Sequence, residues 1–189
     1  MNPRSLRRGA ILALAVVTVA ACNPALNWRE VRVERLVALL PCKPDHARRD
    51  VQLGALNVSM QMTGCEASGG LYAISHVRVA DPSQAAAAQI AWRQASLIPL
   101  QPSSVQTEPF LLARPRVSGQ RASASSAATV PSGAAVDMLR IQARRPDGSP
   151  LQARLLWFTS GADIYHVAVY GPNLTQEMSE MLFSELLLQ

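Results

Sequence analysis

The first 21 residues constrain the fold most, because their pattern indicates a segment that is not part of the folded domain. Arg4, Arg7 and Arg8 precede an uncharged run that extends from residue 10 to residue 21. A positive start followed by an apolar run of about 12 residues is typical of a secretory signal peptide, whereas a membrane-spanning helix needs roughly 20 apolar residues. We therefore predict a signal-peptide helix over residues 1–21 that is removed on export.

The end of this run predicts a lipid anchor. The tetrapeptide Val19-Ala20-Ala21-Cys22 resembles the lipobox of bacterial lipoproteins, in which an aliphatic residue and two small residues precede a cysteine. The resemblance implies cleavage before Cys22 and attachment of lipid to this residue. Such an anchor is stable because each buried CH₂ group contributes about 0.8 kcal/mol. The alternative is a chance cysteine after an ordinary secretory signal.

The residue after the cysteine bears on the destination of the chain. Asn23 stands where an aspartate, in enteric lipoproteins, retains the protein in the inner membrane. We therefore expect the protein at the outer membrane, lipid-anchored and facing the periplasm, with the inner membrane as the alternative. The lipid on Cys22 is the expected membrane attachment, since no later apolar run reaches spanning length.

The charge of the exported part argues against a nucleic-acid partner. The three arginines of residues 1–21 account for much of the basic balance, so the formal net charge falls from +5 to +2 without them. A charge this small lacks the basic footprint of nucleic-acid binding. The length fits one domain, and we predict a short tether over residues 22–30 followed by a single domain over residues 31–189.

Two cysteines remain once Cys22 carries lipid, and they predict a disulfide. Cys42 and Cys65 form an even pair in an oxidising compartment, where a disulfide is the default. Closing a loop of about 23 residues adds roughly 3 kcal/mol of stability in the chain-entropy model. The alternative is a metal site that includes His46, although the Cys-x₃-His spacing lacks a second close pair of ligands. We predict the disulfide, with no metal and no other cofactor.

Alternating apolar residues predict several strands before the first helix. The segment 31–40 favours a strand, although 36–40 alone is compatible with a helix, and Pro41 ends it. Residues 42–50 read as a polar connector. Segments 51–53 and 56–63 predict a hairpin around Gly54, with Gly64 ending the second strand, and residues 71–79 and 105–112 predict two further strands.

Two helices and a meander complete the predicted elements. Asp81 caps a first helix with Pro82 at its first position, Ala85, Ala88 and Trp92 on its inner face and Pro99 at its end. Residues 138–143, 151–159 and 163–170 predict three strands joined by the Pro-Asp-Gly turn at 146–148 and a second turn at 160–162. A closing helix is predicted from a cap at Asn173, and 118–135 is a low-complexity excursion that is expected to be mobile.

The order of elements predicts an α+β fold, in which an antiparallel sheet of about 6–7 strands carries two packed helices. The segments 33–44, 155–158 and 165–169 are similar to the opening and the ending of PsbP-like α+β domains. Asn-Trp-Arg (27–29), Leu-Pro-Cys-Lys-Pro (40–44) and Gly-Cys (64–65) resemble a family of proteobacterial lipoproteins with such a domain. Because these motifs are structural, the resemblance implies a fold and carries no active site. Cys42 departs from the broader PsbP-like pattern, which assigns the disulfide to the smaller family.

The polar residues do not form a recognisable catalytic pattern. His46 lies in the expected connector, while His76 and His166 fall in strands, and His166 is expected to face away from the apolar side or to be a hydrogen-bonded core residue. The chain has no nucleophile elbow, phosphate loop, dinucleotide fingerprint or zinc-protease motif, and its acidic residues are assigned to turns, caps and helix surfaces. The tryptophans read as core residues, with a place at the membrane interface as the alternative for Trp28.

The functional expectation follows from this address and from the lack of a catalytic motif. We expect a non-catalytic binding or assembly module of the cell envelope, which contacts an envelope protein through a sheet face or through residues 99–135. The alternatives are an envelope enzyme with an unrecognised site, for example His46 near Cys42, and a purely structural lipoprotein. The sequence identifies no small-molecule ligand.

Overall fold

The computed structural model describes residues 26–113 and 134–189, and a seven-stranded antiparallel sheet forms its centre. The strands follow the order β3-β4-β5-β9-β8-β7-β6 across the sheet. Their bounds are β3 Asp45–Leu53, β4 Leu56–Ala67, β5 Gly70–Arg78, β6 Ser104–Leu112, β7 Ala134–Arg144, β8 Pro150–Ser160 and β9 Asp163–Gly171. Neighbouring strands are joined mostly by short turns, which is typical of antiparallel sheets.

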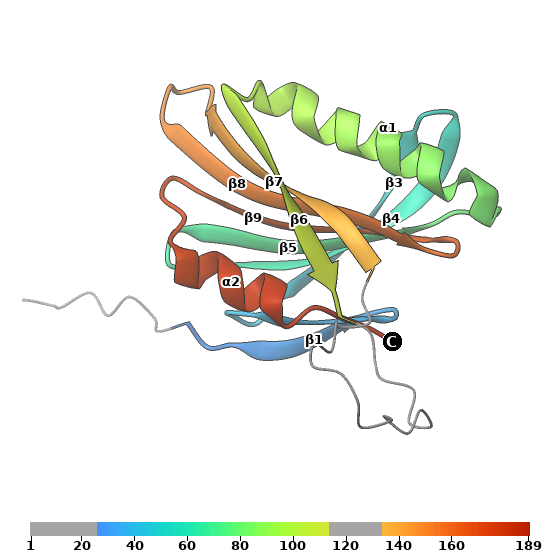
Figure 1. The fold of residues 1–189 in the computed structure, drawn as a ribbon, viewed down its shortest axis with the longest axis horizontal. Helices are drawn as coiled ribbons and strands as arrows, with labels where there is room; N and C mark the ends of the chain where they lie inside the picture. The colour runs from blue at the N-terminus through green and yellow to red at the C-terminus, as the bar shows by residue number, and fades with distance from the viewer. Residues whose placement is uncertain (1–25, 114–133) are drawn as a thin grey trace, which may run out of the picture.

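Two helices and a small second sheet cover the large sheet from opposite sides (Figure 1). Helix α1 (Ala85–Leu97) lies on one face, between the short 3₁₀ helices η1 (Pro82–Gln84) and η2 (Ile98–Leu100). Helix α2 (Gln176–Ser184) lies on the other face together with the small sheet of β1 (Arg29–Val33), β2 (Leu36–Leu40) and β10 (Leu187–Leu188). The predicted α+β class is confirmed, whereas the second sheet was not predicted.

Each face of the large sheet has its own hydrophobic core. The core under α1 contains Ala88 and Trp92 of the helix and Leu155 of the sheet. The core on the α2 side contains Tyr72 of the sheet and Leu182 of α2. Strand β9 contributes alternately to both cores, because consecutive side chains of a strand point to opposite faces. The central strands are therefore buried on both sides.

Two sequence predictions in the first third of the chain are wrong. The segment 31–40 is a hairpin of β1 and β2 rather than one element, and Glu34 turns the chain with a φ of 53°. Residues 42–50, predicted as a connector, contain most of the edge strand β3, which pairs with β4 along its whole length. Six consecutive β3 residues, from Asp45 to Asp50, are exposed, so this strand lacks the alternation by which strands are recognised.

Several boundaries also differ from the predictions. Strand β4 continues past Gly64 to Ala67, and β1 begins at Arg29, inside the predicted tether. Helix α2 is capped by Thr175, whose side chain accepts a hydrogen bond from the Met178 amide, and not by Asn173. Residues 134 and 135 of the predicted excursion belong to β7. The rest of it, 118–133, and the predicted signal peptide lie outside the described residues.

The remaining elements match their predictions closely. Asp81 caps the start of the first helical segment by accepting a hydrogen bond from the Ser83 amide, and Ala85, Ala88 and Trp92 are the buried residues of α1. The meander of β7, β8 and β9 forms as predicted, and so does the hairpin around Gly54. Within residues 26–113 and 134–189, no helix is long and apolar enough to cross a membrane.

Candidate functional site

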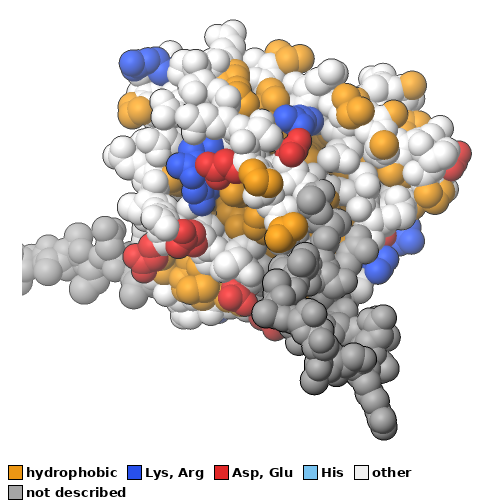
Figure 2. All heavy atoms as spheres, in the orientation of Figure 1, with side chains coloured by type: hydrophobic (Ala, Val, Ile, Leu, Met, Phe, Trp, Pro, Cys, Tyr) orange, Lys and Arg blue, Asp and Glu red, His pale blue; other side chains and the backbone are white. Residues whose placement is uncertain are grey.

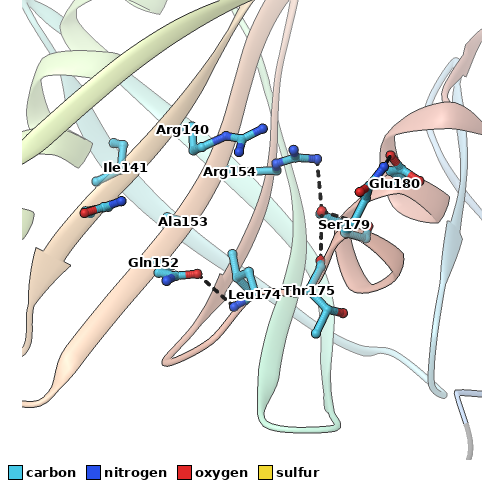
Figure 3. A pocket seen from close by; sticks show the side chains of 11 residues that line it. Arg140, Ile141, Gln152, Ala153, Arg154, Leu174, Thr175, Ser179 and Glu180 are labelled. Carbon is cyan, nitrogen blue, oxygen red and sulfur yellow. Dashed lines mark hydrogen bonds between the residues drawn. The ribbon is translucent and has the colours of Figure 1, made fainter.

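The β7–β8 hairpin places two arginines directly opposite each other. Its turn contains Asp147 and Gly148, whose φ of 82° is in the left-handed region that glycine adopts easily. The register pairs residues that are equidistant from Asp147 along the chain, and Arg140 consequently faces Arg154. Figure 3 shows both side chains extending from adjacent strands toward α2. Opposed residues of this kind have Cβ atoms about 4.5–5.5 Å apart, so the two guanidinium groups share one region.

The start of α2 forms the opposite wall of this region. The Ser179 hydroxyl accepts a hydrogen bond of 2.9 Å from Nη1 of Arg154, and Ser179 itself is buried. Gln152 on β8 accepts a hydrogen bond of 2.9 Å from the Leu174 amide, just before the helix. These two contacts hold the first turn of α2 against β8. The helix and the hairpin thus form a fixed frame rather than two independent segments.

A pocket of about 430 Å³ lies between the hairpin and the start of α2 (Figure 3). We call it the arginine pocket and define it by Arg140, Gln152, Arg154, Thr175, Ser179 and Glu180. Figure 2 shows basic and acidic side chains next to each other on this side of the molecule, with hydrophobic side chains beside them. The walls combine guanidinium, amide, hydroxyl and carboxylate groups, which suits a polar ligand.

The two arginines of the arginine pocket differ in whether a carboxylate pairs with them. Arg140 forms an ion pair of 2.8 Å with Glu108 on β6. Arg154 has no carboxylate within 4.0 Å among the described residues, although it is half-buried. Burial, and then the charge of Arg140, lower the pKa of the Arg154 guanidinium. Like charges directly opposite each other on neighbouring strands are destabilising. An anion placed between the two arginines would relieve this repulsion.

The polar side chains of the arginine pocket are groups that form hydrogen bonds. The lining side chains of the described pocket include no histidine or cysteine, and Glu180, its one carboxylate, accepts a hydrogen bond from Gln176. The Ser179 hydroxyl also donates to backbone carbonyl oxygens of Thr175 and Gln176, which ties it into the helix. The guanidinium groups, in contrast, present donors in a planar fork that matches a carboxylate.

The structure brings together one pair of predicted site residues. Cys42 and Cys65 are joined by a disulfide, so neither sulfur is free to hold a metal ion together with His46. Nδ1 of His46 lies 3.1 Å from the Thr63 hydroxyl instead. No group of three histidine, cysteine or acidic side chains within residues 26–113 and 134–189 is arranged to hold a metal. Cys22, the predicted lipid site, lies outside the described residues.

The other two histidines are buried in different surroundings. Nε2 of His76 lies 2.9 Å from Oδ1 of Asp163, the first residue of β9, as the predicted strand 163–170 requires. His166 is 8 % exposed, and its Nε2 has no hydrogen-bond partner within the described part of the chain. It therefore differs from both predictions, because it faces the core under α1 and is not hydrogen-bonded there.

The residues of the arginine pocket were missed by sequence reasoning. No motif contains Arg140 and Arg154, which meet only through the hairpin register. The signal that reveals them is the predicted turn at 146–148, because a hairpin centred on Asp147 pairs residue 140 with residue 154. The contribution of α2 could not be placed in the same way, since nothing in the sequence fixes where the helix packs.

No protein-family model matches this chain, and no curated protein matches its sequence. The resemblance to PsbP-like lipoproteins accordingly stays a prediction, and the functional argument rests on the geometry of the site.

Proposed function

We propose that this chain is a lipid-anchored protein of the bacterial cell envelope whose folded domain is a non-catalytic binding module. The arginine pocket is its ligand site. One observation carries the binding proposal: Arg154 is half-buried, faces Arg140 across the hairpin and has no carboxylate partner among the described residues. The proposed anchor rests on the sequence of residues 1–22. The proposed position at the outer membrane, facing the periplasm, rests on Asn23.

The ligand that suits this pocket best carries a carboxylate. A guanidinium group binds a carboxylate through two parallel hydrogen bonds, which are stronger than neutral ones. Glu108 pairs with Arg140, and the charges of Glu108 and Glu180 act on Arg154, so the two glutamates offset the formal charge of the two arginines. This favours a group with a single negative charge over a phosphate dianion. We infer that the module binds a carboxylate displayed by an envelope protein or peptide.

Calorimetry with a matched pair of probes tests the binding site. N-acetylalanine carries a carboxylate, and N-acetylalaninamide has the same shape without the charge. We expect the acid to bind the purified full chain and the amide not to bind. The Arg154→Gln variant should bind the acid at least about tenfold more weakly, since hydrogen bonds to charged groups contribute roughly 1.5–3 kcal/mol.

A matched variant distinguishes binding at the arginine pocket from a general effect of the positive charge of the protein. Arg48→Gln removes the same charge from the exposed edge strand β3, where Arg48 donates to Ser59. This variant should bind the acid as the unaltered protein does. Equal binding of acid and amide, or equal loss in Arg48→Gln and Arg154→Gln, would contradict the proposal.

The anchor is tested in cells that carry the gene. The unaltered protein should incorporate labelled palmitate and sediment with the outer membrane, because acyl chains hold it there. The Cys22→Ser variant should incorporate no label. A Cys22→Ser variant that is labelled and retained like the unaltered protein would show that this cysteine is not the lipid site.

A further inference from the structure

The arginine pocket continues into a second pocket along α2. This pocket has a volume of about 680 Å³ and is mostly apolar. We call it the α2 groove and define it by Phe110, Met138, Arg154, Glu180, Met181 and Phe183. Arg154 and Glu180 line the groove and the arginine pocket alike, and the Arg154 side chain extends toward α2 (Figure 3). The two pockets therefore form one continuous site with a charged end and an apolar end.

The pleat of the strands explains why the two ends adjoin. Side chains two residues apart on a strand point to the same face and are about 7 Å apart. Met138 accordingly follows Arg140 on the face of β7 that α2 covers, and Phe110 follows Glu108 on β6 in the same way. Glu108 is the partner of Arg140. The distance from the arginines to the apolar side chains is thus the reach of one large side chain.

The walls of the α2 groove suit an aromatic side chain. Met138 and Phe183 are buried residues that border the groove, Phe110 is partly buried, and Met181 is 39 % exposed. The rings of Phe110 and Phe183 meet edge to face at a centroid distance of 6.2 Å and an interplanar angle of 71°. Methionine side chains adapt to irregular shapes and make favourable contacts with aromatic rings.

The charges along the groove set the direction in which a ligand lies. Glu177 and Glu180 are exposed carboxylates on α2 that border the groove, whereas Arg140 and Arg154 are at its other end. Like charges repel and unlike charges attract. A ligand carboxylate is therefore favoured at the arginines, and the apolar part of the same ligand extends along α2.

Polar groups around the arginines favour a peptide over a fatty acid. Gln142 and Thr175 line the arginine pocket and are exposed, and their amide and hydroxyl groups can both donate and accept hydrogen bonds. A peptide group next to a carboxylate offers matching partners, which an acyl chain lacks. The exposed residues Gln176 and Ser184 leave the groove open to solvent, so a longer chain can continue out of it.

We propose that this site recognises the C-terminus of a protein whose last residue is large and apolar. The inference rests on the proposed function, because the carboxylate of the last residue is the group that Arg140 and Arg154 bind. The side chain of that residue occupies the α2 groove. An internal residue lacks the carboxylate, and a small last residue leaves the groove empty, so the two pockets together select the end of a chain and its side chain.

The test compares two dipeptides of identical composition and charge by calorimetry with the purified full chain. N-acetylalanylphenylalanine carries its carboxylate on the aromatic residue, and N-acetylphenylalanylalanine carries it on the small one. We expect the first to bind about tenfold more tightly, because only its ring is at the right distance from the carboxylate to be buried in the groove.

A pair of variants assigns this preference to the α2 groove. Met181→Gln makes an exposed wall polar at nearly constant length and should reduce the preference at least about threefold. Ile90→Gln makes the same kind of change on α1, where Ile90 is 59 % exposed and lines neither pocket. This variant should keep the full preference. Equal preferences in the two variants would contradict the role of the groove.

The remaining outcomes separate this inference from the proposed function. Equal binding of the two dipeptides, with N-acetylalanine still bound through Arg154, would overturn the selection of the last residue and leave the carboxylate site intact. Failure of all three acids to bind would overturn both. Octanoate should bind more weakly than N-acetylalanylphenylalanine. Tighter binding of octanoate that Met181→Gln weakens would assign the groove to a fatty acid and overturn the inference.

Discussion

At the scale of single residues, the contacts of buried polar side chains are features of the structure that the sequence pattern does not predict. Asp163 is the one acidic residue among the described residues that is buried. It bonds to His76 on the neighbouring strand, and Nη1 of Arg78 lies 3.6 Å from the same oxygen. Asp163 and Arg78 are directly opposite in the register of β5 and β9. These three side chains therefore link the neighbouring strands β5 and β9 at one end.

Removing the Asp163 carboxylate should lower the free energy of unfolding. In Asp163→Ala, Nε2 of the buried His76 loses its partner, which costs about 1–3 kcal/mol of the free energy of unfolding. Urea denaturation measures the change. Asp137→Ala, which removes an exposed carboxylate from β7, should change the free energy of unfolding far less. A loss of equal size in the two variants would show that the buried bond contributes nothing specific.

His166 should make stability depend on pH. Burial lowers the pKa of this residue from 6.5 to about 3, so below pH 6.5 the unfolded chain takes up a proton that the folded chain does not. The contribution of this group is full above pH 6.5 and is lost as the pH falls toward 3.

The predicted slope is up to about 1.4 kcal/mol per pH unit within that window. Denaturation of the unaltered protein and of His166→Phe at several pH values measures it, and the variant should lose stability less steeply on acidification. Parallel pH profiles would mean that the imidazole is not buried as a neutral group.

At the scale of elements, sequence patterns identify the strands and helices that bury one face and miss those that do not. The α1 segment was predictable because Asp81, Pro82 and the alanine run agree with one another. Edge strand β3 was not, because its side chains from 45 to 50 are exposed and polar. Its pairing with β4 depends on backbone hydrogen bonds, which leave no hydrophobic pattern.

The candidate site was less predictable than the fold, for a related reason. Arg140 and Arg154 are charged residues on strands. Each of them, taken alone, would ordinarily be expected to face solvent. Their proximity follows from the hairpin register, which the turn around Asp147 does predict. The wall supplied by Ser179 depends on the packing of α2, a contact between distant parts of the chain that no local pattern specifies.

The start of α2 offers a direct comparison of prediction and structure. Thr175→Ala removes the side-chain oxygen that accepts from the Met178 amide, and should lower the free energy of unfolding by about 1 kcal/mol. Asn173→Ala should have little effect, since Asn173 lies before the cap and is exposed. Thermal or urea denaturation compares the two variants. A larger loss in Asn173→Ala would restore the cap predicted from sequence.

The disulfide links the segment after β2 to strand β4, and thereby the small sheet to the large one. Reduction should destabilise the domain by roughly 3 kcal/mol, because the unfolded chain is freed from a closed loop. The midpoint of urea denaturation should therefore fall when a reductant is added. The Cys42→Ala/Cys65→Ala variant should show the lowered midpoint with and without reductant. A midpoint that does not respond to reduction in the unaltered protein would contradict this account.

At the scale of the whole molecule, the large sheet separates two pockets that share no lining residue. The arginine pocket is on the α2 face, and a second pocket of about 470 Å³, formed by α1, η2 and strands β3, β4, β5 and β9, is on the other face and has polar and apolar walls. Each is bounded by a helix that leaves part of its sheet face uncovered. With the proposed lipid on Cys22, the proposed binding module would be tethered to the membrane and would present the arginine pocket on one face of its sheet.

The central claim is that the arginine pocket binds a carboxylate, and an NMR titration tests it most directly. N-acetylalanine is added to the ¹⁵N-labelled full chain while backbone amide signals are followed. We predict saturable shifts at Arg140, Arg154 and Thr175, no shifts at His166, and no response to N-acetylalaninamide. Shifts that do not saturate, that centre elsewhere on the molecule, or that appear equally with the amide would contradict the claim.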